Sequence, residues 1–336
     1  MKKRITIKDI AKVLNVHHST VSRALRNDPR VNAKTRDTVL AYAREHEYQT
    51  NMNAVQLRGT SNNAIALIVP NINHSFFADI ISQLTNLAYN KGYVISVFQS
   101  NEKYQQEKEI VNTIIQHNFA GVIVSIAKDT INSDHFALLK KFGIPLVFFD
   151  RVCEDIFTPK VKVNNYEITA NATEYLIKKG YSNIAHFTGT TSINVFRERQ
   201  NGYVDILQKY GMEYVQPIVI EEDFSVEIGK IIFSRLWNFS VKPDAIISSS
   251  VHVSTGILLE ARKYGIKIPE DLGLITFGSL LSSEIIEPQI TYIEQPELEI
   301  AAIAFDLLEK MIKKEIQIGE LIERQVQAEI IFKKSC

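Results

Sequence analysis

Residues 6–27 read TIKDIAKVLNVHHSTVSRALRN, and their apolar positions recur at helical intervals on both sides of a short break. Thr6 and Asp9 have the spacing of a capping box, which predicts a first helix over about 7–14. A second helix is expected to begin at His18 or Ser19 and to end at Leu25, after only a tight turn. Its polar side chains are expected to face outward: Ser19, Ser22, Arg23 and Arg26.

A third helix is predicted after Asn32, a plausible N-cap, and continues to about Glu45 with Val39, Leu40 and Ala43 on one face. The result is three short helices around one small core. Two helices joined by a tight turn, with a polar and cationic second helix, are typical of the helix-turn-helix, whose second helix enters the DNA major groove.

Charge is distributed unevenly along the chain. Residues 1–60 contain twelve Lys and Arg against five Asp and Glu, a net charge of +7, so the remainder carries −7 and the whole chain is neutral. A basic block on an otherwise acidic chain suggests an electrostatic footprint for nucleic acid, although a solvated helical surface gives the same pattern.

Composition indicates a folded chain of two to three domains, because 336 residues with 45% hydrophobic and 23% charged side chains are ordinary for globular proteins. No apolar run approaches a membrane span, and Lys8, Asp9 and Lys12 interrupt any secretory signal. Cys153 and Cys336 have no paired spacing. We therefore expect a cytoplasmic protein with no membrane contact, no metal site and no cofactor.

Beyond the polar residues 59–63, strand-like apolar runs alternate with helical patterns. The runs are 64–69, 94–98, 121–124, 145–149, 184–187, 245–247 and 274–277. Several helices end in Gly followed by an apolar residue, at Gly92, Gly143, Gly180, Gly211 and Gly265. This alternation predicts an α/β body of parallel sheets covered on both faces, and its length predicts two lobes with a cleft between them.

The head closely resembles the headpiece of the lactose-repressor (LacI) family. The residues that carry this resemblance are 6–11, 16, 20–23, 31, 35–36 and 39–40. The resemblance implies that His18, Ser19 and Arg23 reach base edges, while Thr20, Ser22 and Asn27 contact phosphate or backbone. It also places Thr6 and His17 in the DNA-binding surface, although His17 stands where the family usually has Ser and so changes the N-cap.

The resemblance continues into a hinge over 51–62, where Asn51, Ala54, Leu57 and Arg58 match the family's DNA-binding pattern. Leu57 corresponds to an apolar wedge for the minor groove, or else packs against the next domain. Thr50 and Val55 replace the usual Pro and Arg.

The body resembles the periplasmic-binding-protein-like core of the same family. The matching segments are 65–70, 148–151, 268–273 and 293–296. The resemblance implies a head over 1–50 and an effector-binding and dimerisation core over 63–336. It further implies that the chain crosses between the lobes three times, with one lobe over about 63–163 and 292–323 and the other over about 164–291 and 324–336.

Ligands of parallel α/β sheets gather at the carboxyl ends of the strands. Family matches there give six effector-facing positions: Phe76, Phe77, Asp150, Arg199, Phe224 and Ser250. Apolar faces with Arg and Asp suit a polyol or sugar. The alternatives are that Phe76 and Phe77 belong to the interlobe core and that Arg199 and Asp150 form a structural ion pair.

Two polar anchors of the family are absent, because Val251 and Gly278 stand where it usually has Asp. Ser249, Ser250 and His252 are possible substitutes, and His74 is a possible pH-sensitive donor in the cleft. These differences suggest another ligand, weaker binding, or regulation by a protein partner.

The sequence therefore predicts a homodimeric, sequence-specific DNA-binding regulator, a repressor, that binds a pseudo-palindromic operator under the control of a small sugar-like effector. It carries none of the common catalytic motifs, so we do not expect an enzyme. Two alternatives remain: a solute-binding module without DNA function, and a regulator with a vestigial cleft controlled by a protein.

Overall fold

The computed structural model describes residues 5–25, 27–46, 48, 63–212, 218–219, 224–238, 240–278 and 287–336. They belong to two compact units, Met1–Asn62 and Asn63–Cys336, which are described separately. The hinge positions Asn51, Ala54, Leu57 and Arg58 lie outside the described residues.

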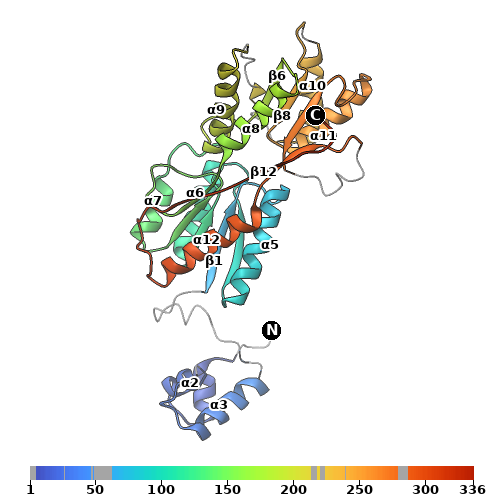
Figure 1. Cartoon of the computed structure of the whole chain (residues 1–336). Helices are drawn as coiled ribbons and strands as arrows, with labels where there is room; N and C mark the ends of the chain where they lie inside the picture. The colour runs from blue at the N-terminus through green and yellow to red at the C-terminus, as the bar shows by residue number, and fades with distance from the viewer. Residues whose placement is uncertain are drawn as a thin grey trace. The chain divides into compact units, whose positions relative to one another are not determined.

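The described part of the head contains the three predicted helices (Figure 1). They are α1 (Ile7–Val13), α2 (His18–Leu25) and α3 (Ala33–Glu45), within one residue of the expected bounds. Their apolar faces meet in a small buried core: Ile10, Ala11, Val21, Ala24, Val31, Val39 and Ala43. The helical spacing of these residues is what closes the three helices on one another.

The ends of the head helices follow from local hydrogen bonds. Thr6 and Asp9 form the predicted capping box, in which the Asp9 amide donates to Thr6 Oγ1 and the Thr6 amide donates to Asp9 Oδ2. Asn15, in the turn between α1 and α2, has a φ of 51°, a left-handed conformation that Asn tolerates. Asn32 caps α3 by accepting from the Lys34 amide.

The first lobe of the core is a six-stranded sheet in the order β11-β5-β4-β3-β1-β2, with every neighbouring pair parallel. Its strands are β1 (Ala64–Val69), β2 (Val94–Gln99), β3 (Gly121–Val124), β4 (Leu146–Phe149), β5 (Lys160–Val163) and β11 (Glu323–Val326). Its helices are α5 (Ser75–Asn90), α6 (Tyr104–Gln116), α7 (Asp134–Lys141) and α12 (Glu297–Ile312).

The second lobe repeats this plan in the order β12-β10-β9-β8-β6-β7, with only the β10–β12 pair antiparallel. Its strands are β6 (Ile184–Thr188), β7 (Ile218–Val219), β8 (Ala245–Ser248), β9 (Gly273–Phe277), β10 (Thr291–Glu294) and β12 (Glu329–Ile331). Its helices are α8 (Asn165–Lys178), α9 (Asn194–Lys209), α10 (Val226–Trp237) and α11 (Val251–Lys263). Figure 1 shows the two lobes joined by the crossing segments.

The two sheets locate the three crossings between lobes. The first follows β5, as predicted near residue 163. The predicted boundaries at 291/292 and 323/324 fall inside β10 and β11, so the second and third crossings lie a few residues later. Both strands contain polar residues, and the sequence pattern did not reveal them as strands.

Each of the seven predicted apolar runs forms a strand, and the Gly that ends each of five helices has a positive φ, between 63° and 99°. After α5, the Tyr93 amide donates to the Ala88 carbonyl and the Gly92 amide to the Tyr89 carbonyl, the pairing of a Schellman stop. These short stops return the chain directly to the sheet and keep the next strand parallel.

Helices α10 and α11 cross at their glycines. A Cβ on Gly256 would lie 2.1 Å from the Val226 carbonyl oxygen and 2.8 Å from the Gly229 Cα. Backbone therefore packs directly against backbone beside β8, and the crossing fixes the start of α11 at the carboxyl end of the sheet.

We expect Gly256→Ala to destabilise the core by about 1–3 kcal/mol, because the added methyl must push two helix backbones apart. The midpoint of urea unfolding measures this change. Leu259→Ala, on an exposed position of the same helix, is the control and should change the midpoint little. Equal midpoints for Gly256→Ala and the wild type would show that the crossing is not close-packed.

Candidate DNA-binding surface and effector site

Helix α2 presents a polar surface at its N-terminal half. His18 and Arg23 are exposed, and Ser19 and Thr20 are half-buried. These residues share the outer side of the helix, because Val21 and Ala24 point into the head core. Positive charge and hydrogen-bonding groups on one helix face are the features that read base edges in the major groove.

His17 takes the place of the usual Ser at the start of α2. Its Nδ1 accepts from the Ser19 amide at 3.4 Å and lies 2.8 Å from Ser19 Oγ. Its carbonyl accepts from the Thr20 amide, which begins the helix. The imidazole therefore contributes to the cap in place of a hydroxyl, and Ser19 is held by this contact.

The expected outward orientation of Ser22 is wrong. Ser22 is only 6% exposed and is buried on α2 together with Val21 and Ala24. Asn27 is exposed and has a φ of 58°, in the left-handed turn that ends α2. Thr6 is exposed and engaged in the capping box of α1.

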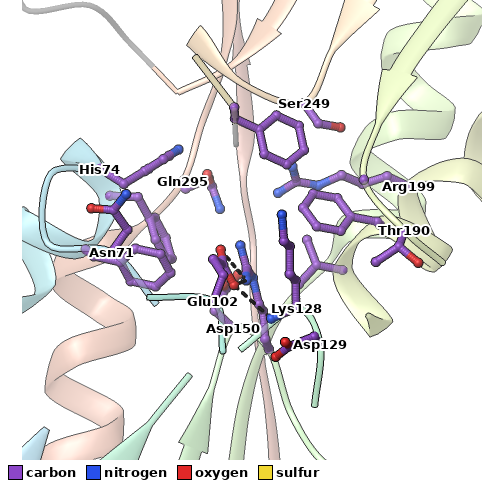
Figure 2. A pocket seen from close by; sticks show the side chains of 17 residues that line it. Asn71, His74, Glu102, Lys128, Asp129, Asp150, Thr190, Arg199, Ser249 and Gln295 are labelled. Carbon is purple, nitrogen blue, oxygen red and sulfur yellow. Dashed lines mark hydrogen bonds and ion pairs between the residues drawn. The ribbon is translucent and has the colours of Figure 1, made fainter. Parts of the chain in front are cut away.

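A cavity of about 310 Å³ lies between the two lobes of the core. Its wall is formed by residues that follow strands of both sheets, at their carboxyl ends, as the topology predicts. The lining residues are Asn71, His74, Phe76, Phe77, Glu102, Lys128, Asp129, Asp150, Arg151, Gly189, Thr190, Val195, Phe196, Arg199, Phe224, Ser249 and Gln295 (Figure 2).

Arg199 reaches the cavity from α9 and is only 3% exposed. Its Nε donates to Asn165 Oδ1 at 2.9 Å, and its guanidinium carbon lies 3.5 Å from the centre of the Phe277 ring. Burial lowers the pKa of Arg199 to about 9, partly offset by the negative charge of Asp150.

Asp150 follows β4 and is held with a φ of 57°. Its carboxylate accepts from Ser125 Oγ at 3.4 Å, and its carbonyl accepts from Asn194 Nδ2. Burial raises the pKa of Asp150, whereas Arg151 and Arg199 act in the opposite direction. No oxygen of Asp150 lies within 4 Å of an Arg199 nitrogen, so the alternative of a structural ion pair is wrong.

The principal ion pair of the cavity, missed from the sequence, joins Arg151 and Glu102 at 2.8 Å. Glu102 also accepts from the Lys128 amide, which fixes the loop after β3. The guanidinium of Arg151 lies 5.6 Å from the centre of the Phe196 ring. Because Glu102 and Arg151 are 49 residues apart, no local pattern could have paired them.

Aromatic rings form two sides of the cavity. Phe76 and Phe77 meet edge to face at 5.1 Å, and Phe196 and Phe224 stack at 5.4 Å. Three of the six expected effector positions, Phe76, Phe77 and Phe224, thus form the apolar sides of the cavity, together with Phe196, which the sequence did not single out. Rings of this kind cover the flat faces of a bound ligand.

Ser250 does not line the cavity, but its neighbour Ser249 does. Ser250 is buried at the start of α11, where its amide donates to Ser248 Oγ. The two departures from the family lie together, because a Cβ on Gly278 would be 3.9 Å from Val251 Cγ1. The two positions where the family usually has Asp thus carry one apolar side chain, that of Val251, and no carboxylate.

Two buried imidazoles lie at or beneath the cavity. His74 contacts His252 of the opposite lobe, with ring centres 5.6 Å apart, and burial lowers the pKa of His74 to about 4. His186, in β6, is fully buried without a hydrogen-bond partner for either ring nitrogen, and burial lowers its pKa to about 3. Both imidazoles are therefore neutral at pH 7.

A helix-turn-helix head in the same chain as a two-lobed core with a polar interlobe cavity defines the class of ligand-binding transcription regulators. Two family models match. "Bacterial regulatory proteins, lacI family" covers residues 6–51, and "Periplasmic binding proteins and sugar binding domain of LacI family" covers residues 62–335. The chain belongs to the LacI family and is a DNA-binding transcription regulator, not an enzyme.

Individual relatives agree with this assignment. The chain is 30% identical over 295 residues to the NTD biosynthesis operon regulator NtdR of Bacillus subtilis (strain 168), covering 88% of this chain and 89% of that protein. It is similar in fold to the lac repressor dimer bound to operator and an anti-inducer, with a TM-score of 0.84, 21% identity and 99% coverage of both chains. It is also similar to a LacI-family regulator of Enterococcus faecium with bound ribose, with a TM-score of 0.71, 22% identity, and 81% and 98% coverage.

Among the described residues, no helix is both long enough and apolar enough to span a membrane. The match to the head model also disfavours the alternative of a solute-binding module without DNA function.

We expect His186→Leu to reduce the acid sensitivity of the core. The folded pKa of about 3 lies below the usual value of about 6.5, so the unfolded chain binds more protons between these values and stability falls as pH falls. When the pH is lowered from 7.5 to 5, the free energy of unfolding measured in urea should decrease by about 2 kcal/mol more for the wild type than for the variant. Tyr203→Phe, which alters the ring packed on His186, should keep the wild-type pH dependence; equal slopes for wild type and His186→Leu would contradict the assignment.

Proposed function

We propose that this regulator is a cytoplasmic repressor that binds a pseudo-palindromic operator as a homodimer. The observation that carries the proposal is the exposed polar face of α2, with Arg23 and His18 beside a capped N-terminus. One three-helix head offers too few contacts for specificity, whereas two heads double them. Similarity to the lac repressor dimer bound to operator supports this arrangement.

Within each head we assign two kinds of contact. His18, Ser19 and Arg23 face base edges, where Arg favours guanine. Thr6, His17, Thr20 and Asn27 contact phosphate and fix the register. Ser22 belongs to the packing of α2, since it is buried. The hinge residues Asn51, Ala54, Leu57 and Arg58 complete the DNA-binding surface.

Genomic-fragment selection with the purified protein at stated salt, followed by sequencing of the bound DNA, tests operator recognition. A recurrent palindrome is expected. Binding that is sensitive to salt but indifferent to sequence would reduce the head to a nonspecific anchor.

On the selected operator, we expect Arg23→Ala to weaken specific binding by about 1–3 kcal/mol, because a bidentate contact to a base is lost. Fluorescence anisotropy at fixed salt measures the affinity. Arg44→Ala removes the same charge from an exposed position at the end of α3 and should have a smaller effect. Equal effects of the two variants on specific and random DNA would contradict base recognition by Arg23.

For the cavity we propose a small, polar, sugar-like effector. Arg199 supplies donors, Asp150 supplies an acceptor, and Phe76, Phe77 and Phe196 cover the flat faces of the ligand. The volume of about 310 Å³ suits a monosaccharide-sized molecule, and the ribose bound to the Enterococcus faecium regulator supports this class. Binding changes the lobe angle and thereby the affinity of the heads for operator.

The test uses any sugar that changes operator affinity. We expect Asp150→Asn to raise the half-effective concentration of that sugar at least tenfold, because a charged acceptor becomes a neutral amide. Operator anisotropy with increasing sugar gives the half-effective concentration. Asp134→Asn, at an exposed position in the first turn of α7, is the control. An unchanged response in Asp150→Asn would remove Asp150 from the ligand contacts.

A further inference from the structure

The carboxylates of the cavity all lie on one lobe. Of the described lining residues, Glu102, Asp129 and Asp150 belong to the first lobe, which also contributes the cations Lys128 and Arg151. The described lining of the second lobe contains one charged side chain, Arg199. An electrically asymmetric cavity of this kind favours one orientation of a polar ligand and one sign of charge at each end.

Arg199 has no carboxylate within 4 Å to balance its charge. Its described contacts use Nε, which donates to Asn165, and one face, which lies on Phe277. Figure 2 shows the guanidinium extending from α9 toward the middle of the cavity. An almost fully buried guanidinium without a direct ion pair is costly, and an anion in contact with it would recover part of that cost.

Unused hydroxyls lie at the neighbouring start of α11. Ser249 lines the cavity, is 8% exposed, and its buried Oγ has no hydrogen-bond partner. Ser250 precedes the first turn of α11, yet its side chain makes no capping hydrogen bond and its Oγ is also without a partner. The amides at the N-terminus of this 13-residue helix carry a partial positive charge.

The first turn of α11 contains no acidic side chain. Val251 and Gly278, at the two positions where the family usually has Asp, lie close together beside it. The negative charge of Glu198, which also belongs to α9, acts to raise the pKa of Arg199, but Glu198 does not line the cavity. The second-lobe wall therefore presents a guanidinium and a hydroxyl, and α11 begins two residues after that hydroxyl's residue, Ser249.

We propose that this wall is an anion subsite, so that the effector is a sugar-like molecule bearing a carboxylate or phosphate group. The anionic group binds Arg199 and Ser249, and the hydroxyls of the ligand extend toward Asp150. The proposal rests on the proposed role of the cavity as the effector site and specifies the chemistry of its ligand. Asp150, whose carboxylate is in no ion pair among the described residues, repels an anion and fixes the orientation; Glu102 is already paired with Arg151.

Simple anions test the subsite without knowledge of the effector. Isothermal titration of the full chain with inorganic phosphate, and separately with acetate, should show saturable binding of one anion per chain at millimolar concentration, measured at constant ionic strength against chloride. Binding of phosphate but not acetate assigns a phosphate ester, and the reverse assigns a carboxylate. Absence of saturable binding of both anions overturns the proposal.

Variants locate the binding. Arg199→Gln should weaken anion binding at least tenfold, while Arg235→Gln, which removes an exposed charge from α10, should leave it unchanged. Because a buried substitution can disturb folding, Ser249→Asp is a second variant; it keeps Arg199 but adds a negative charge, and should abolish binding with an unchanged far-UV circular dichroism spectrum. Equal anion affinity in wild type, Arg199→Gln and folded Ser249→Asp overturns the proposal.

A matched set of glucose, gluconate and glucose 6-phosphate, assayed by operator anisotropy, separates this inference from the proposed function. Operator release by glucose at lower concentration than by both anionic forms would overturn the anion subsite and leave the regulator role intact. Saturable anion binding that Arg199→Gln abolishes, in a protein that binds no operator, would support the subsite and refute the proposed function.

Discussion

The parallel arrangement of two sheets is the constraint on which the candidate site depends. Strands buried on both faces need a covering helix between each pair, so all turns at the carboxyl ends collect on one edge of each sheet. The three crossings turn these two edges toward one cavity. Asp150 after β4 and Ser249 after β8 are far apart in sequence and line the same space for this reason alone.

Much of this architecture could be predicted from the sequence, because fully buried strands are uninterrupted apolar runs. The strands that escaped prediction have a different physical character. In β5, Lys160–Val163, lysines alternate with valines, and β11 is polar because it lies at the sheet edge. The pairing of such polar strands depends on long-range neighbours, so the second and third lobe crossings, after β10 and β11, lie a few residues later than predicted.

The candidate site was predictable only where position along the chain determines exposure. Residues that follow strands, such as Asp150 directly after β4 and Phe76 in the first turn of α5, line the cavity as expected. Two serines do not lie as predicted: Ser22 is buried on α2 instead of facing outward, and Ser250 does not line the cavity. At a helix end, successive residues turn by about 100°, so a shift of one position separates the inside from the outside. The Glu102–Arg151 pair required the fold itself to bring two distant loops together.

Under the proposed function, buried charges of opposite sign that do not pair with each other provide the coupling between ligand binding and lobe angle. Arg199 and Asp150 are both nearly inaccessible and belong to different lobes, yet no direct ion pair closes the gap. Buried charges without a direct ion-pair partner lower the stability of the fold, so a structural role alone does not explain why they are present. A ligand with an acceptor for Arg199 and a donor for Asp150 satisfies both only at one separation of the lobes. Its binding free energy therefore selects one lobe angle, which is the differential interaction that any conformational switch requires.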